Sequence, residues 1–103
     1  MFTLTRAAAK RIRSDALVDD RVELALRVAA RRAQDGGIEY RMGFDELTTQ
    51  DILLSANGVD VVIAAHDKEL LSGTTLDYVE MEPGVHRFIF LNPNDPHYRE
   101  PKE

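Results

Sequence analysis

Residues 73–95 read GTTLDYVEMEPGVHRFIFLNPND and decide the fold of the chain. Alternating side chains over residues 76–81 predict a β-strand, and a Pro83-Gly84 turn leads into a second strand. That second run, residues 88–91, is apolar on both faces, so we expect it to be covered on both sides. The two prolines of residues 92–96 then end the hydrogen-bonding ladder. The segment therefore predicts a β-hairpin whose second strand lies deep in the core.

The N-terminal third predicts a helix followed by a strand. Thr5 is a good N-cap for a helix that begins at Arg6, and a narrow apolar stripe supports that helix. The stripe consists of Ala8, Ala9, Ile12 and Ala16. Residues 22–29 alternate between large apolar residues and polar or small ones, which predicts a strand with one solvent-exposed face. Residues 1–4 are compatible with a short edge strand before the helix.

Turn formers divide the middle of the chain into further strands. Asp35-Gly36-Gly37 is typical of a turn into a strand at residues 38–43, and Asn57-Gly58 is typical of a tight hairpin turn. That second turn joins expected strands at residues 52–54 and 59–64, after which Asp67 is expected to cap a short helix. The expected range of this helix is 68–72. The predicted order, β-α-β-β-β-β-α-β-β, indicates an α+β fold built as a compact β-sandwich.

Length and composition limit the classes of protein to which the chain can belong. The 103 residues favour one domain, which we place at residues 1–95, with residues 96–103 as a flexible C-terminal tail. No apolar run approaches the roughly 20 residues of a membrane span, and the N-terminus lacks the order of a signal peptide. We therefore expect a cytoplasmic protein without a membrane partner. The chain contains no cysteine, which excludes disulfides, thiolate nucleophiles and Cys-ligated clusters.

Charge is unevenly distributed along the chain. The net charge is −5, although residues 1–32 hold 8 of the 13 Lys and Arg residues. A basic helix and strand end of this kind could meet nucleic-acid phosphates, or simply form a solvated surface. The residues concerned are Arg6, Lys10, Arg11, Arg13, Arg31 and Arg32. Because Phe2 is the only aromatic residue before Tyr40, no stacking platform accompanies them, and nucleic-acid binding is the less favoured alternative.

The motifs G-T-x-L-D-Y-V and F-x-F-x-N-P-N, with an opening T-L-T-x-x-A-A-x-x-I, resemble the HesB/IscA-like A-type carriers of iron–sulfur assembly. The resemblance covers nearly the whole chain and implies their fold, with an N-terminal helix and one short internal helix. It also implies that Asp35 stands where the first ligand cysteine of the family would be. The family's paired cysteines would fall near Arg99 and Pro101. We therefore expect the scaffold of a carrier without cluster binding.

A narrower resemblance adds the substituted C-terminal end. The strings YRMGFDELT (40–48), TTLDYVEMEPG (74–84) and FIFLNPNDPHYR (88–99) are similar to a cysteine-less, DsrR-like branch associated with dissimilatory sulfur oxidation. This resemblance implies a non-enzymatic accessory or regulatory protein. Its role would lie in the expression or maturation of the sulfur-oxidation machinery.

Metal and catalytic sites find little support in the residues. The possible oxygen and nitrogen ligands are Asp35, Glu39, His66, His86, Asp95 and His97. None shows a metal-ligand spacing, and carboxylates would suit a hard mononuclear ion, such as iron, rather than a cluster. Ser14, Ser55 and Ser72 have no base nearby in sequence, so we expect no enzyme activity and no cofactor.

Protein docking is the leading hypothesis, because the scaffold motifs remain while the ligands are absent. The partner-docking surface that we predict lies beside the position of the missing cysteines, although each of its residues is equally compatible with a merely solvated surface. Its candidate residues are Gln34, Asp35, Tyr40, Arg41, Asn92, Asn94, Asp95, Tyr98 and Arg99. Tyr and Arg are favoured anchors of protein interfaces.

Overall fold

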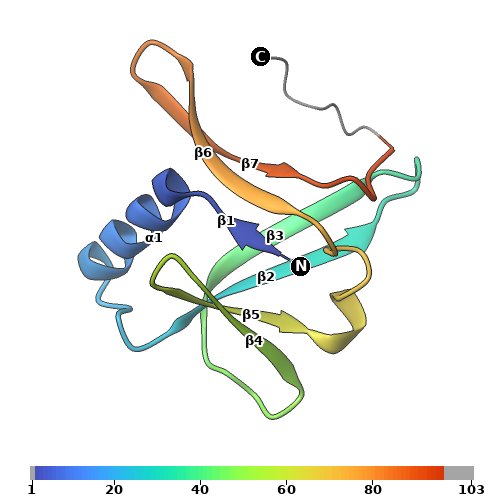
Figure 1. Cartoon of the computed structure of the whole chain (residues 1–103), viewed down its shortest axis with the longest axis horizontal. Coiled ribbons are helices and arrows are strands. Elements are labelled where there is room, and N and C mark those ends of the chain that lie inside the picture. The colour runs from blue at the N-terminus through green and yellow to red at the C-terminus, as the bar shows by residue number, and fades with distance from the viewer. Residues whose placement is uncertain (1, 97–103) are drawn as a thin grey trace.

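The computed structural model describes residues 2–96 and contains one α-helix, one short 3₁₀ helix and strands in two sheets (Figure 1). Within this range, no helix is long and apolar enough to cross a bilayer. The elements are β1 (Thr3–Leu4), α1 (Arg6–Val18), β2 (Ala25–Arg32), β3 (Ile38–Asp45), β4 (Asp51–Ala56), β5 (Val59–Ala64), η1 (Ala65–Asp67), β6 (Thr75–Glu82) and β7 (Val85–Leu91). The predicted order of elements is confirmed.

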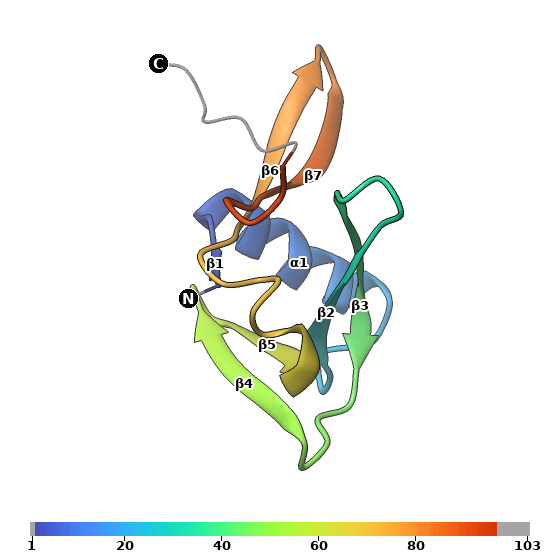
Figure 2. The same cartoon turned by 90° about the vertical axis from the view of Figure 1, so that its right-hand side faces the viewer.

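The strands form a three-stranded sheet, β1-β6-β7, and a four-stranded sheet, β3-β2-β5-β4. The pairs β1–β6 and β2–β5 are parallel, whereas the other pairs are antiparallel. Helix α1 contacts β6 of one sheet and β5 of the other, so it bridges the two sheets on one side (Figure 2). The predicted α+β class with two packed sheets is confirmed.

One hydrophobic core lies between the helix and the sheets. Leu26, Val28 and Val61 of the four-stranded sheet meet Leu76 of the three-stranded sheet, and each is at most 3% exposed. Helix α1 adds Ala8, Ala9 and Ile12, the first three members of the predicted stripe. Its start is also as predicted, because the Thr5 hydroxyl accepts a hydrogen bond from the Ala8 N–H at 3.1 Å.

Strand β2 begins later than the alternation of residues 22–29 predicts, and Val22 is 59% exposed. The reason is the end of α1, which draws the following residues into a Schellman-type cap. The Arg21 N–H donates to the Ala16 carbonyl at 2.8 Å, and Asp20 adopts a left-handed conformation with φ of 56°. Polypeptide that closes a helix in this way is not free to join a sheet.

The short internal helix also differs from its prediction. A 3₁₀ turn spans Ala65–Asp67, and the expected helix at 68–72 is a run of turns that ends at Gly73. Asp67 is the last residue of η1 rather than an N-cap, and its carboxylate lies 3.3 Å from His66 Nε2. Gly73 has φ of 76°, which explains why a glycine closes this segment.

The prediction of a deeply buried second strand in the hairpin is wrong. β7 pairs with β6 alone among the described strands and forms an edge of its sheet. Phe88, Ile89, Phe90 and Leu91 are only half-buried, because helix and core residues cover one face of this sheet. A register irregularity between Glu80 and Glu82 interrupts the β6–β7 ladder near its turn. An apolar run can therefore belong to an edge strand.

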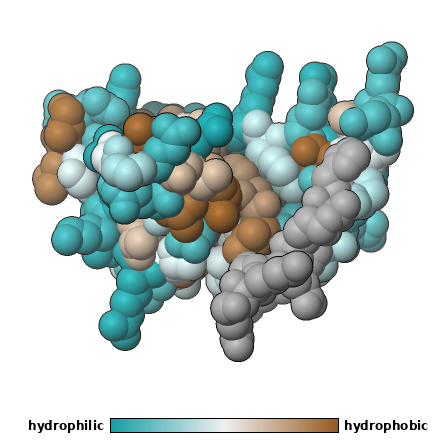
Figure 3. All heavy atoms as spheres, turned by 90° about the horizontal axis from the view of Figure 1, so that it is seen from above, coloured by the Kyte–Doolittle hydropathy of each residue, from teal (hydrophilic) through white to brown (hydrophobic). Residues whose placement is uncertain are grey.

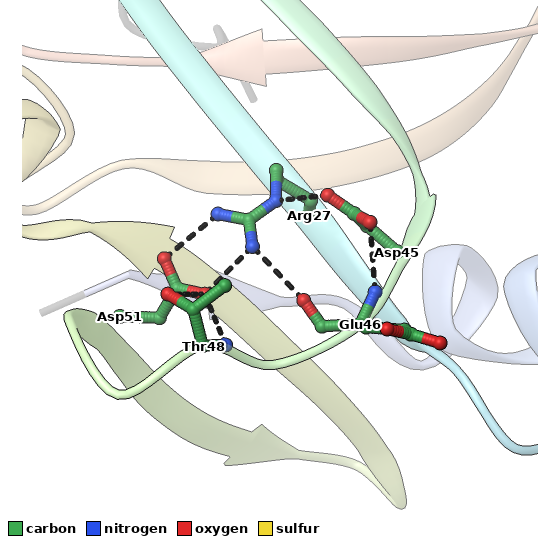
Figure 4. Close-up of polar contacts among 5 residues, drawn as sticks. All are labelled: Arg27, Asp45, Glu46, Thr48 and Asp51. Atoms are coloured by element: carbon green, nitrogen blue, oxygen red, sulfur yellow. Dashed lines mark hydrogen bonds and ion pairs between the residues drawn. The ribbon is translucent and has the colours of Figure 1, made fainter.

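Arg27 of β2 holds the connection between β3 and β4 (Figure 4). Its Nε donates to Asp45 Oδ2 at 2.6 Å, and its two terminal nitrogens donate to the carboxylate of Asp51 at 2.8 and 2.6 Å. The same side chain donates to the Glu46 carbonyl at 3.0 Å. Asp51 accepts in addition from the Thr48 N–H and hydroxyl. One guanidinium thus fastens both ends of the connection between the two edge strands of the sheet.

This network covers a small apolar site on the outer face of the four-stranded sheet. Val62 is completely buried, although it points away from the face that carries Val61 and Ile63. In the register, Val62 lies between Arg27 and Leu53. A long arginine stem can shield such a residue while its charged end pairs with carboxylates. The polar network and this buried valine therefore belong to one structural unit.

The Arg27 network predicts that the protein loses stability in acid. Hydrogen bonding from Arg27 lowers the pKa values of Asp51 and Asp45 below their ordinary value of 3.8. A lowered folded-state pKa stabilises the fold above the unfolded value, so this stability should be present above about pH 4 and disappear as the pH falls further. Urea unfolding followed by circular dichroism at pH 7, 4 and 3 measures this loss.

The substitution D51N should destabilise the protein at pH 7 and make the remaining stability less dependent on pH. D60N is the matched control, because Asp60 forms no ion pair within residues 2–96. Equal acid sensitivity of D51N and the parent protein would contradict the assignment.

Candidate protein-docking site

The turn between β2 and β3 uses Asp35 internally. Asp35 Oδ1 accepts a hydrogen bond from the Gly37 N–H at 2.9 Å, and Gly36 has φ of 87°. The Ala33 N–H donates to the Gly37 carbonyl at 2.8 Å, which closes the turn. Arg32 donates to the Gly36 carbonyl at 3.0 Å. The interpretation of Asp35 as a turn residue is confirmed, since its carboxylate holds the local backbone.

Tyr40 joins the edge strands of the two sheets. Its ring stacks on Phe90 of β7 with centroids 4.3 Å apart and an interplanar angle of 2°. Its hydroxyl donates to Asp95 Oδ2 at 3.4 Å. Burial raises the pKa of Tyr40, hydrogen bonding with Asn92 opposes the change, and the negative charge of Asp95 adds to it. The phenol is therefore held neutral at the join between β3 and β7.

Asn92 and Asn94 fasten the end of β7 to the loop before β6. The Asn92 side-chain amide donates to the Leu70 carbonyl at 2.7 Å, and its Oδ1 accepts from the Asn94 N–H at 2.9 Å. The Asn94 amide donates to the Ser72 carbonyl at 2.7 Å. Asn92 is 1% exposed, so it supports the surface from beneath instead of presenting a contact atom.

The proline between these asparagines packs against the same loop. A Cβ on Gly73 would lie 3.4 Å from Pro93 Cγ, and the positive φ of Gly73 would strain any other residue there. The N-P-N motif therefore acts as a clasp on residues 70–73. We call this unit the N-P-N clasp.

A shallow depression of about 340 Å³ runs along β2 and β3 beside Tyr40. Its residues are Ala29, Ala30, Arg31, Glu39, Tyr40 and Arg41. Arg31 Nε lies 2.6 Å from Glu39 Oε1, and both side chains are largely exposed. Arg41 is exposed and pairs in register with Ala29, a small residue that leaves space beside the guanidinium. The depression thus presents charges of both signs next to an aromatic ring.

The structure brings together part of the predicted docking set. Tyr40, Asn92, Asn94 and Asp95 are connected through the contacts above, and Asn94 is exposed. Gln34 and Asp35 are exposed at the hairpin tip. In Figure 2 this tip lies apart from the segment that follows β7. Tyr98 and Arg99 lie outside the described residues.

The alternative ligands are dispersed. Within residues 2–96, no three His, Asp or Glu side chains gather in a group that could hold a metal ion. His66 lies in η1 beside Asp67, and His86 stacks on Tyr78 with ring centroids 5.3 Å apart. His97 lies outside the described residues. Any mononuclear iron site would need donors that this part of the chain does not bring together.

The predicted basic surface is largely occupied by internal contacts. Arg11 pairs with Asp15 at 3.1 Å and lies over the Tyr78 ring, while Arg13 donates to the Asn57 carbonyl. Arg31 and Arg32 are engaged at the β2–β3 turn, as described above. These contacts weaken the nucleic-acid alternative at four of the six predicted residues, because a phosphate would compete with an existing partner there, while Arg6 and Lys10 are exposed.

Sequence reasoning missed three structural contributors. Phe90 supplies the ring beneath Tyr40, and the Leu70 carbonyl receives the Asn92 amide. Arg27, which the strand alternation places on the solvent side, organises the β3–β4 connection. The aromatic run of residues 88–91 was the available signal for Phe90. A backbone carbonyl in a distant loop leaves no signal in the sequence.

Comparisons with known proteins agree with this geometry. Residues 1–94 match the family described as iron-sulphur cluster biosynthesis. The iron-sulfur cluster insertion protein ErpA of Histophilus somni is 36% identical over 94 residues, which cover 90% of this chain and 82% of that protein. An uncharacterized protein of Bradyrhizobium diazoefficiens is 34% identical over 95 residues, covering 91% and 89% of the two chains.

Two solved structures share the fold. IscA with a [2Fe-2S] cluster has a TM-score of 0.76 at 30% identity, covering 90% of this chain and 86% of IscA. Escherichia coli SufA has a TM-score of 0.75 at 25% identity, covering 96% and 86%.

The N-P-N clasp predicts that substitutions of Asn92 and Gln34, two amide residues of the predicted docking set, have unequal effects on stability. N92A should lower the free energy of unfolding by about 1–3 kcal/mol, because it removes a buried amide that donates to the Leu70 carbonyl and accepts from the Asn94 N–H. Q34A should change it by less than about 0.5 kcal/mol, since Gln34 is exposed at a hairpin tip. Equilibrium urea unfolding measures both values, and similar losses for the two variants would refute the clasp.

Proposed function

We propose a function from the premise that the chain belongs to the iron–sulphur cluster biosynthesis family, which confirms the HesB/IscA-like resemblance. The protein is a non-enzymatic accessory member of that family. It docks onto a protein partner through the surface around Tyr40 and the N-P-N clasp, and it carries no cluster.

The observation that carries this proposal is the absence of cysteine from the whole sequence. Protein-bound iron–sulfur clusters are held by thiolates, with histidine as the established substitute in a few centres. The residues present do not fit such a group. Asp35, at the position that the family resemblance assigns to the first ligand, is a hard oxygen donor already bonded within its own turn.

The surface that remains is suited to docking. The Tyr40–Phe90 stack and the N-P-N clasp hold the exposed groups in one arrangement before a partner arrives, which lowers the ordering cost of association. Arg41 and the half-buried Tyr40 are of the anchor types that protein interfaces favour, and the exposed Asn94 lies on the same surface. Asp95 lies beside Tyr40 on this surface, whereas Gln34 and Asp35 at the hairpin tip are a separate part of it, and Tyr98 and Arg99 follow Asp95 in sequence.

The partner class follows from the narrower resemblance. The cysteine-less, DsrR-like pattern supports a cytoplasmic role in the expression or maturation of a sulfur-oxidation system. ErpA is named as an insertion protein for iron–sulfur clusters, which supports a partner from the same maturation chemistry. The protein would act by recognising that partner rather than by delivering metal and sulfide.

Cluster reconstitution tests the first half of the proposal. Incubation with ferrous iron, sulfide and a thiol reductant should leave the protein colourless after desalting. The control is the triple variant D35C/R99C/P101C, which restores thiols at the positions implied by the family resemblance and should gain iron and visible absorbance. A stoichiometric, coloured product on the unmodified protein would refute the proposal.

Affinity capture tests the second half. The tagged protein should retain the same partner from a host extract with and without nuclease treatment. R41E should lose that partner, because it reverses the charge of an exposed anchor. K10E, on the exposed side of α1, should keep it. Retention that disappears with nuclease would instead establish the nucleic-acid alternative.

A further inference from the structure

A second concave surface lies where α1 ends. A groove of about 330 Å³ opens between the last turns of α1, the connection to β2 and the β4–β5 turn. Its apolar lining is formed mainly by Ile12, Ala16, Leu24, Leu26, Phe44 and Val59. In Figure 1 the end of α1 lies on the left, whereas the β2–β3 hairpin tip and the segment after β7 lie on the right. The groove is therefore separate from the docking surface proposed above.

Large apolar side chains project beside this groove. Leu17, Val18 and Val22 are 72%, 81% and 59% exposed, and all three fall within six consecutive positions of the chain. Leu17 and Val22 also line the groove itself. Figure 3 shows hydrophobic atoms standing out at the left end of the molecule, the end that holds the last turn of α1 in Figure 1. Single exposed apolar residues are ordinary, but a cluster beside a groove indicates an interaction surface.

The rim of the groove is held in place without a partner. The Schellman-type cap fixes the chain direction after α1, and the Leu24 N–H donates to the Arg21 carbonyl at 3.0 Å. Asp20 keeps its left-handed backbone without being a glycine, a conformation that costs free energy. Across the groove, Arg13 donates to the Asn57 carbonyl and connects α1 to the β4–β5 turn. A rim fixed in this way reduces the entropy lost on binding.

Acidic side chains surround the apolar cluster. Asp60 lines the groove, and Asp19, Asp20 and Glu23 are exposed on the connection between α1 and β2 that forms its rim. None of the four forms an ion pair within residues 2–96. The side chains of Arg11 and Arg13 already form an ion pair and a hydrogen bond, respectively. Among the basic residues at positions 11–24, this leaves Arg21 as the one without an ion pair or side-chain hydrogen bond of this kind. This rim repels anionic membranes and nucleic acids and attracts a basic surface.

We propose that the groove binds an amphipathic helix of a protein partner, with apolar side chains in the groove and Lys or Arg residues against the acidic rim. An apolar groove with charged edges is the usual complement of such a helix. Since this site and the N-P-N clasp lie at different ends of the molecule, the chain could hold two proteins at once (Figure 1).

Model peptides test the proposal directly. The probe is a fluorescein-labelled Leu/Lys peptide with apolar residues at helical spacing. Two matched peptides serve as controls: a Leu/Glu peptide of the same pattern, and a Leu/Lys peptide of the same composition without an apolar face. Fluorescence anisotropy should show saturable binding of the first peptide only. Binding should weaken with added salt, because exposed charges contribute to it.

Substitutions then locate the site. L17S/V22S should weaken binding about tenfold or more, since apolar anchors dominate such interfaces. D60K should weaken it at low salt and reduce its salt dependence. V85S is the matched control, because Val85 is 48% exposed on β7, far from the groove in sequence, and should leave binding unchanged. R41E, at the other proposed surface, should also leave it unchanged, so the two proposals fail separately.

The outcomes separate the possible occupants. Amide NMR shifts of residues 12–24 and 57–60 on addition of the Leu/Lys peptide would support the proposal. Equal binding of all three peptides, or unchanged binding by L17S/V22S, would overturn it. So would a concentration-dependent dimer that L17S/V22S converts to monomer, because the groove would then accommodate a second copy of the chain.

Discussion

The two sheets depend on the join between β3 and β7. The three-stranded sheet includes a strand of two residues, and a sheet of this size needs a packing partner for stability. Helix α1 provides that contact on one side, and the stack of Tyr40 on Phe90 provides it on the other. The clasp then connects the same end of β7 to the loop that leads into β6. This join therefore connects the two sheets on the side away from α1.

Local chemistry made much of the fold predictable. Thr5 satisfies an N–H of the first helical turn, and the turns at Gly36 and Gly58 use the positive φ that their sequences favour. Burial was less predictable, because it depends on neighbours that are distant in sequence. Phe88 and its neighbours show the same apolar run in an edge strand that a central strand would show. β2 starts late because a helix cap uses Asp20 in a left-handed conformation. Glycine is the usual residue at such a position, so the sequence did not indicate this cap.

The sequence predicted which residue types form the candidate site, but not how deeply each side chain is buried. Tyr40 and Asp95 do lie together, as the motifs suggest, since both belong to segments that meet at the join. Asn92, by contrast, faces inward, because its amide satisfies a carbonyl that no motif identifies. The chain therefore keeps this framework although its sequence contains no cysteine. That framework is held by hydrogen bonds, stacking and glycine geometry, and none of these forces requires a metal.

The edge position of β7 has a consequence for the solubility of the protein. Within residues 2–96, one side of β7 pairs with no strand, and β7 carries apolar residues on both faces. Such an edge is a template for intermolecular β-pairing, from which fibrillar aggregates grow. The irregularity between Glu80 and Glu82 interrupts the ladder at one end of that edge, and the exposed Arg87 adds a positive charge there. These residues act as gatekeepers. Substitutions that restore a regular, uncharged edge at these positions should therefore lower solubility, even though the positions lie outside both proposed binding surfaces.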